Sequence, residues 1–243
     1  MCLTYGRPRI LEESVESFLR QDYSGEKELI VLNDLPEQTL TFDHPDVHII
    51  NVDKRFRTVG EKRNACAALC SHDWLLPWDD DDIYLPWRIS YSMEMMDSER
   101  RFFKSALAFG HNNGAITKIF KSTFHAGSCW HRTLFDEVQG YPHMGSGEDL
   151  EIERKFAQVL ASNCLGFDIP LEDLYYVYRW YGTGSYHLSA FGQTRKGNES
   201  EHVMVADYVS QQLASGNVPS GEIPLNPHWK TDYVAAVAQY LDQ

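Results

Sequence analysis

The sequence has no long hydrophobic run, few cysteines and a shortage of positive charge. No apolar stretch approaches the roughly 20 residues that a helix needs to cross a bilayer, and the amino terminus lacks the charged-then-apolar layout of a secretory signal. The five cysteines form no C-x-x-C pair, and an odd number argues against a disulfide framework. We therefore expect a soluble protein without a membrane span, with free thiols, in the cytoplasm.

The shortage of positive charge excludes some partners. The chain has 22 Lys and Arg against 35 Asp and Glu, a formal net charge of −13. Such a charge repels nucleic-acid backbones and anionic membranes. A local basic groove stays open, because Arg55, Arg57, Lys62 and Arg63 are close in sequence.

The chain length of 243 residues suits one large domain. A hydrophobic fraction of 43% can form a packed core, and the sequence contains no internal repeat. We expect a domain over residues 1–195, with a nucleotide-binding half (about 1–100) and an acceptor half (about 101–195), and a helical extension over 196–243.

Strands and helices alternate in the first half. Apolar runs predict strands, and stripes of period 3.6 predict helices, with Glu12, Glu13 and Glu16 facing outward. The expected strands are 1–5, 29–32, 47–52 and 74–78, and the expected helices are 10–21 and 60–71. This alternation predicts an α/β fold with a mixed, mostly parallel sheet, whose ligand site lies at the carboxyl ends of the strands.

The second half is less regular. We expect strands at 106–109, 115–120 and 175–181 and helices at 87–97, 132–138 and after Gly147. Two further helices, 201–213 and 231–241, are joined by a Gly- and Pro-rich linker over 215–227. These helices form the C-terminal appendage.

Four consecutive aspartates, Asp79 to Asp82, directly follow an apolar strand. Neighbouring carboxylates repel one another unless a cation neutralises them, and hard ions such as Mg²⁺ and Mn²⁺ prefer oxygen ligands. A solvated acidic loop or an adventitious calcium site is the alternative. The position of the run directly after a buried strand favours a functional site.

Five motifs in order resemble the family-2 glycosyltransferases of GT-A fold, over roughly residues 1–185. They are Leu3-Thr4-Tyr5-Gly6-Arg7-Pro8, Val31-Leu32-Asn33-Asp34, Gly60-Glu61-Lys62-Arg63-Asn64, Trp78-Asp79-Asp80-Asp81-Asp82-Ile83-Tyr84-Leu85-Pro86 and Gly147-Glu148-Asp149. The resemblance implies a metal-dependent, inverting transferase that uses a nucleotide-diphosphate sugar.

The resemblance also implies roles for residues that bind the nucleotide-sugar. Thr4 and Tyr5 would line the base, with Arg7 in the same loop. Asp34 would accept a hydrogen bond from uracil or ribose, which favours UDP, although a turn-forming Asp is an equal alternative. Arg63 would approach the diphosphate, and Asn64 would shape the same wall.

The acidic motifs would supply the metal site and the catalytic base. In a D-x-D motif matched by Asp79-Asp80-Asp81, Asp81 would bind Mn²⁺ or Mg²⁺, while Asp79 and Asp80 would contact ribose or metal-bound water. Because four aspartates follow one another, the motif can also be aligned one residue later, which leaves open which of Asp80, Asp81 and Asp82 binds the metal. Asp149 would be the catalytic base and Glu148 would orient the acceptor; in the alternative, both only favour the start of a helix.

A late histidine, His187, follows a Gly-rich loop and is a candidate second metal ligand, with a structural role as the alternative. His125 and His131 are weaker candidates. The loop from Thr183 to Lys196 is a candidate lid over the donor.

The sequence does not distinguish whether the acceptor hydroxyl belongs to a glycan, a protein or a small molecule. The acidity of the chain disfavours modified DNA as the acceptor. Two other functions compete. A nucleotidyltransferase would share the metal and the nucleotide, and a catalytically inactive module would bind glycan or nucleotide-sugar without turnover.

Overall fold

The computed structural model describes residues 1–96, 100–112, 114–121, 124–161, 166–179 and 198–242. The first half contains β1 (Cys2–Thr4), α1 (Pro8–Leu19), β2 (Leu29–Asn33), β3 (Gln38–Thr41), β4 (Val47–Asn51), α2 (Val59–Leu69), β5 (Trp74–Leu75), β6 (Ile83–Tyr84) and α3 (Arg88–Glu94). The second half contains β7 (Phe102–Lys104), β8 (Leu107–Asn112), β9 (Ala115–Lys121), η1 (His125–Gly127), β10 (Ser128–His131), α4 (Arg132–Glu137), α5 (Glu148–Leu160), η2 (Leu171–Asp173), β11 (Tyr176–Arg179), α7 (Asn198–Ala214), β12 (Gly221–Pro224) and α8 (Tyr233–Leu241).

The strands form a mixed arrangement with a parallel amino-terminal part. Strands β1, β2 and β4 pair in parallel in the order β1-β2-β4. The later strands pair mostly antiparallel, in the orders β5-β10-β7 and β6-β11-β8-β9. All five residues of β2 are buried, as expected for a parallel strand covered on both faces. The predicted α/β class is confirmed.

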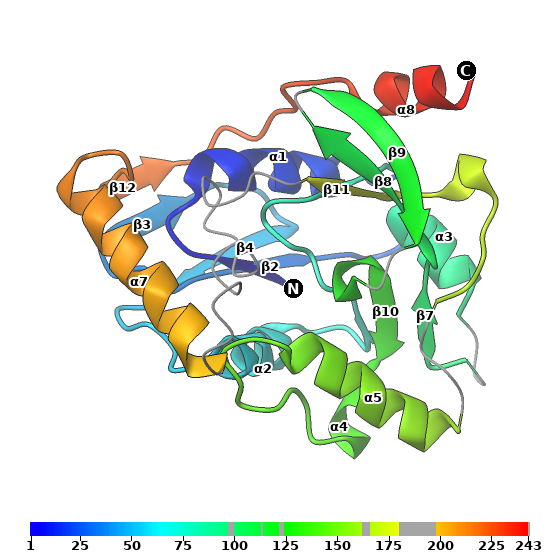
Figure 1. Ribbon diagram of the computed structural model, residues 1–243, viewed down its shortest axis with the longest axis horizontal. Coiled ribbons are helices and arrows are strands. Elements are labelled where there is room, and N and C mark those ends of the chain that lie inside the picture. Colours follow the sequence, from blue (N-terminus) through cyan, green and yellow to red (C-terminus); the bar gives the residue numbers. More distant parts are fainter. Residues whose placement is uncertain (97–99, 113, 122–123, 162–165, 180–197, 243) are drawn as a thin grey trace.

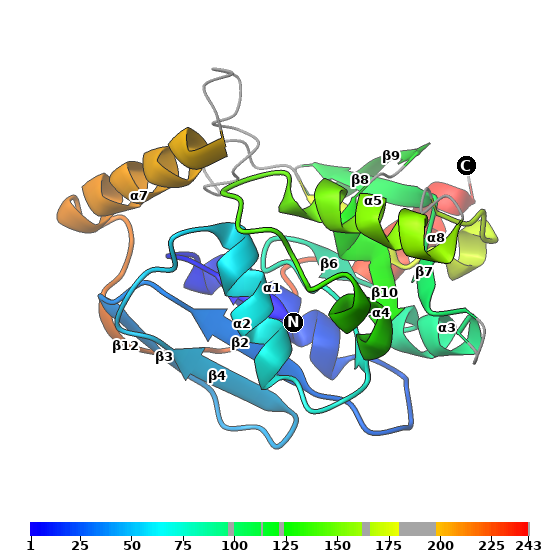
Figure 2. The ribbon, with the colours of Figure 1, turned by 90° about the horizontal axis from the view of Figure 1, so that it is seen from below.

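Helices cover both sides of the strands (Figure 1). On one side α1 and α8 contribute Leu11, Val15, Phe18 and Val237 to one hydrophobic cluster. On the other side α2, α4 and α5 contribute to a second cluster that contains Cys66, Leu134, Ile152 and Phe156. Figure 2, the view from below, shows α2, α4 and α5 together on this second side. The apolar stripes predicted for α1 and α5 are therefore the faces that pack.

The burial of one α1 residue, Glu13, differs from the prediction. Glu13 was expected to face solvent, but the residue is only 1% exposed. It accepts hydrogen bonds from Arg179 Nη1 at 2.7 Å and from the Tyr233 hydroxyl at 2.9 Å. Because Arg179 is on β11 and Tyr233 begins α8, a buried ion pair ties α1 to two elements that lie far away in the sequence.

The carboxyl-terminal segment also differs from expectation. Its two helices are present, but residues Gly221–Pro224 of the expected linker form β12, which pairs in parallel with β3. Sequence reasoning missed β12 because a Gly- and Pro-containing stretch lacks a strand pattern, although an edge strand tolerates proline. Within the part of the chain that the structure describes, no helix is both long and apolar enough to span a bilayer.

The buried Glu13–Arg179 pair predicts a stability difference between two glutamates of one helix. Glu13→Gln removes the carboxylate that pairs with the buried Arg179, and breaking a buried ion pair costs about 3–5 kcal/mol in the free energy of unfolding. Glu16→Gln breaks only the exposed pair with Arg20, so it should cost less than about 1 kcal/mol. Urea denaturation of both variants measures the difference, and equal effects would contradict the role of Glu13.

The same pair gives this stability difference a pH dependence. Burial alone would raise the pKa of Glu13, but Arg179, Tyr233 and Lys230 together outweigh burial and lower the pKa below its ordinary value of 4.5. A lowered folded-state pKa stabilises the protein above the unfolded-state value, and this stabilisation is lost as the pH falls through the folded-state pKa. The cost of Glu13→Gln should therefore be full near neutral pH and shrink below about pH 4.5.

Candidate active site

The predicted motifs meet at a cavity of about 410 Å³. Among the motif residues with a predicted role, every one that the structure describes lines it except Asn64; these are Thr4, Tyr5, Arg7, Asp34, Arg63, Asp79, Asp80, Asp81, Glu148 and Asp149. A second cavity of about 420 Å³ is lined by Met1, Trp74 and His131 among others and contains none of them. We place the site in the first cavity because the acidic motifs converge there.

The four aspartates of the acidic run point in different directions. Arg7 forms ion pairs with Asp80 and Asp81, and its Nη1 lies 2.8 Å from Asp81 Oδ2. Asp82 turns toward β11, where its two oxygens accept hydrogen bonds from the Tyr176 hydroxyl at 2.6 Å and the Arg179 amide at 2.9 Å. The run therefore contains a pair, Asp80 and Asp81, that binds Arg7, and a third residue, Asp82, whose side chain faces the interior of the protein.

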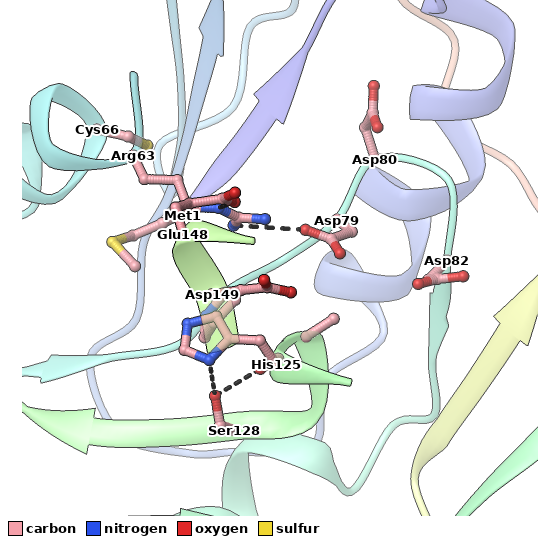
Figure 3. A network of polar contacts seen from close by, with 12 residues as sticks. Met1, Arg63, Cys66, Asp79, Asp80, Asp82, His125, Ser128, Glu148 and Asp149 are labelled. Carbon is pink, nitrogen blue, oxygen red and sulfur yellow. Dashed lines mark hydrogen bonds and ion pairs between the residues drawn. The ribbon is translucent and has the colours of Figure 1, made fainter. Parts of the chain in front are cut away.

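Arg63 links the acidic run to the second acidic motif. Its Nε donates to Glu148 Oε1 at 2.8 Å, and its Nη1 lies 3.7 Å from Asp79 Oδ1. Figure 3 shows Arg63 between these two carboxylates, with Asp149 nearby and Asp80 pointing away. Arg63 therefore lies in the cavity wall, where its ion pairs are with carboxylates of the protein.

The second acidic motif begins α5. Gly147 has a φ of 75°, in the left-handed region that favours glycine, and the helix starts at Glu148. Glu148 is buried, and burial raises its pKa against the opposing effect of Arg63. Asp149 is half-buried and lines the cavity; its Oδ1 accepts a hydrogen bond from the Leu150 amide at 2.8 Å. The two neighbouring acids thus have different surroundings.

Asn64 does not line the cavity and instead fixes the segment that leads to α5. Its amide donates to the Tyr141 carbonyl at 2.9 Å and accepts from the Tyr141 amide at 2.8 Å. Gly60 of the same helix lies against this segment so closely that a Cβ would sit 1.9 Å from the Pro142 oxygen. These contacts hold Glu148 and Asp149 beside α2.

Asp34 lies at the other end of the cavity and already has partners. Its side chain is buried and accepts hydrogen bonds from Lys62 Nζ at 2.5 Å and the Phe56 amide at 3.1 Å. Lys62 also donates to the Thr4 carbonyl at 2.6 Å. A carboxylate has about four lone-pair sites, so Asp34 retains the capacity to accept from a ligand. Lys62 belongs to the motif Gly60-Glu61-Lys62-Arg63-Asn64, whose pattern does not predict this contact with Asp34.

Sequence reasoning missed Phe124 and His202 of α7, which line the cavity, because they carry no local signal. Phe124 stacks with Tyr178, another cavity residue, with ring centroids 4.3 Å apart. His125, a weak candidate in the sequence, lines the wall with Nδ1 2.9 Å from Glu153 Oε1 and Nε2 2.6 Å from the Tyr141 hydroxyl. His187 and the loop Thr183–Lys196 lie outside the described residues.

The carboxylates suit a hard divalent cation. Among the described residues there is no group of three or more His, Cys, Asp or Glu side chains arranged to hold a metal. Mg²⁺ is usually bound through one or two carboxylates together with waters and substrate phosphates, so a complete cage is unnecessary. Burial raises the pKa of Asp80 to about 6 despite Arg7, which means that additional positive charge would stabilise its anion. Asp80 and Asp81 therefore fit a metal that arrives with its phosphate ligand.

Comparisons with known proteins agree on one family and one fold. Residues 2–139 match the family described as Glycosyl transferase family 2. No curated protein matches the sequence. Among solved structures, S. aureus TarS 1–349 in complex with UDP-GlcNAc has a TM-score of 0.54 and 15% identity, with 88% of this chain and 71% of that chain covered. At this identity the likeness concerns the fold.

Two further structures show how much of the length of similar proteins this chain covers. The Pyrobaculum calidifontis mannosyltransferase PcManGT, in complex with GDP-Man and Mn²⁺, has a TM-score of 0.54 and 13% identity, with 99% of this chain and 78% of that chain covered. The longer structure of S. aureus TarS has a TM-score of 0.53 and 13% identity, with 88% of this chain covered. This chain spans only 43% of that structure.

The close approach of Gly60 to Pro142 predicts that even one methyl group disturbs the site. Gly60→Ala should destabilise the fold by about 1–3 kcal/mol, because backbone must move to admit the Cβ. It should also speed amide hydrogen exchange over residues 140–147. Gly127→Ala is the matched control, since its Cβ would lie 3.7 Å from Tyr176, an ordinary contact. Exchange rates that are unchanged in Gly60→Ala would contradict this account of the wall.

Proposed function

Because the chain belongs to glycosyl transferase family 2, we propose that it transfers a sugar from a nucleotide-diphosphate sugar, with UDP-sugars favoured, to an acceptor hydroxyl, with inversion at the anomeric carbon. One observation carries the proposal. The acidic run after β5 and the Glu148–Asp149 pair at the start of α5 meet in one cavity, joined by Arg63. A transferase needs both parts, one for the diphosphate and one for the acceptor.

The residues divide into donor and acceptor roles. We assign Thr4, Tyr5 and Asp34 to the base of the nucleotide and Asp79 to Asp81 to its diphosphate, since all of them line the cavity. Mn²⁺ or Mg²⁺ bound by Asp81 would neutralise charge on the departing diphosphate. Arg7 holds Asp80 and Asp81 in place and would add positive charge beside a bound diphosphate. His187 stays a candidate second ligand.

Asp149 is the proposed base. Its carboxylate takes the proton of the acceptor hydroxyl while the acceptor oxygen bonds to the anomeric carbon and the bond to the diphosphate oxygen breaks. The nucleoside diphosphate leaves with the electron pair. Asp149 suits this role better than Glu148, because Glu148 is committed to Arg63 and Asp149 is the more accessible of the two. Glu148 accepts a hydrogen bond from Arg63 and so fixes the position of Arg63 in the cavity wall.

The choice of donor is supported only broadly. The TarS 1–349 structure holds UDP-GlcNAc and the PcManGT structure holds GDP-Man with Mn²⁺, so a donor panel must include uridine and guanosine diphosphate sugars. The acceptor is a hydroxyl of a glycan, a protein or a small molecule. The expected cytoplasmic location and the division at residue 195 stay predictions.

A panel of nucleotide-sugars with Mn²⁺ tests the proposal through release of free nucleoside diphosphate. At least one donor should be consumed, and a chelator should stop the reaction. Asp149→Asn should lower turnover by roughly 10²- to 10⁴-fold, because general-base catalysis is worth about that much, while donor binding persists. Asp81→Asn should weaken binding of donor with metal.

Glu151→Gln is the control on the same helix, since Glu151 pairs at the surface with Arg154, and it should retain wild-type turnover. Failure of every donor to bind would contradict the proposed function. Full activity of Asp149→Asn would remove Asp149 as the base and leave the transferase assignment standing.

A further inference from the structure

The carboxyl-terminal helix α7 reaches the base end of the cavity. Glu201, His202 and Val205 of α7 line it, and Figure 1 shows the helix at the end of the molecule that holds β3 and β12. The packing is close: a Cβ on Gly6 would lie 3.2 Å from Val209 Cγ1. Val209 is fully buried in a cluster with Leu35, Val205 and Val218. The helix is thus a fixed part of the cavity wall.

His202 makes three polar contacts with the loop after β4. Its Nε2 lies 3.0 Å from the Phe56 carbonyl oxygen, so Nε2 must carry the proton and donate. Nδ1 is then an acceptor, and it lies 3.3 Å from Arg55 Nη2. The His202 carbonyl accepts from Arg55 Nη1 at 2.9 Å. Only 8% of His202 is exposed, so this neutral tautomer is held firmly.

These contacts place the Arg55 guanidinium over an aromatic ring. Arg55 Cζ lies 4.2 Å from the centroid of the Tyr5 ring, and both residues line the cavity beside Asp34. Guanidinium and aromatic planes are the surfaces on which nucleobases stack. His202 holds the stack from α7 through two contacts with Arg55, and replacing its side chain removes the one made by Nδ1 while the contact with the backbone carbonyl persists.

We propose that α7 completes the nucleobase subsite, with His202 as a positioning residue that holds Arg55 against Tyr5 and the stacked pair as the wall that receives the base. The inference rests on the proposed function, since it assigns the base end of the same cavity. Arg55 and Tyr5 would touch the ligand, and His202 acts through Arg55. Donor specificity then depends on a helix outside the segment that matches the family, residues 2–139.

The test compares a nucleoside diphosphate with a probe that lacks the base. UDP, GDP and inorganic pyrophosphate, each with Mn²⁺, are titrated by calorimetry into wild type and variants. His202→Ala and Arg55→Lys should each weaken nucleoside diphosphate binding about tenfold, in line with the loss of one stacking surface, and leave pyrophosphate binding unchanged. Arg55→Lys keeps the positive charge, so its loss of affinity reports the planar surface. In turnover, KM for the donor should rise and kcat should hold.

Two further variants separate positioning from general damage. His202→Gln offers an amide donor and acceptor in place of the ring nitrogens and should recover part of the affinity. Val203→Ala removes an exposed side chain of α7 and should bind like wild type. Thermal melting confirms that each variant is folded.

The outcomes are distinct. Nucleoside diphosphate affinity that is equal in wild type, His202→Ala and Arg55→Lys overturns this inference alone. Equal loss of pyrophosphate and nucleoside diphosphate binding also overturns it, because α7 would then only support the cavity as a whole. A wild-type protein that binds no nucleoside diphosphate overturns the proposed function and this inference with it.

Discussion

Four adjacent carboxylates at the edge of a buried sheet repel one another, and the fold meets this constraint with arginines from three separate elements. Arg7 precedes α1 and pairs with Asp80 and Asp81. Arg63 of α2 lies beside Asp79, and Arg179 of β11 donates through its amide to Asp82 and through Nε to the Asp81 carbonyl. The acidic run is therefore held at once by contacts from the residue before α1, from α2 and from β11.

The same arginines connect the site to distant parts of the chain. Arg63 joins the run to Glu148, so the donor and acceptor sides of the cavity share one cation. Arg179 joins the run to Glu13, and Glu13 in turn binds the Tyr233 hydroxyl of α8. A change in α8 can thus reach the acidic run through three buried contacts, Tyr233–Glu13, Glu13–Arg179 and Arg179–Asp82.

Sequence patterns predicted the elements whose burial is regular. The stripe of Leu11, Val15 and Phe18 and the apolar run of β2 both identify packed faces, and the match over residues 2–139 confirms the family that the motifs predicted. The place of Asp79 to Asp82 at the edge of the sheet followed from the apolar strand before them, whereas only the resemblance to the family implied that Glu148 and Asp149 belong to the same site. Their individual roles stay predictions.

Other features could not be predicted because they depend on tertiary partners. Glu13 resembles its neighbours Glu12 and Glu16 in sequence, and only the approach of Arg179 and Tyr233 makes it a buried ion. Asn64 belongs to the same motif as Arg63, but the neighbouring segment determines that it binds Tyr141. His202 lies well beyond the last recognisable motif, and only folding brings α7 to Arg55.

The central claim is that the acidic run held by Arg7 receives a metal and the diphosphate of a donor. The most direct measurement is an anomalous difference map from crystals of the protein grown with Mn²⁺ and UDP. The account predicts one manganese peak bound by the Asp81 carboxylate and a diphosphate oxygen, with the base against Arg55 and Tyr5. Nucleotide bound outside this cavity, or manganese bound away from Asp79 to Asp82, would contradict it.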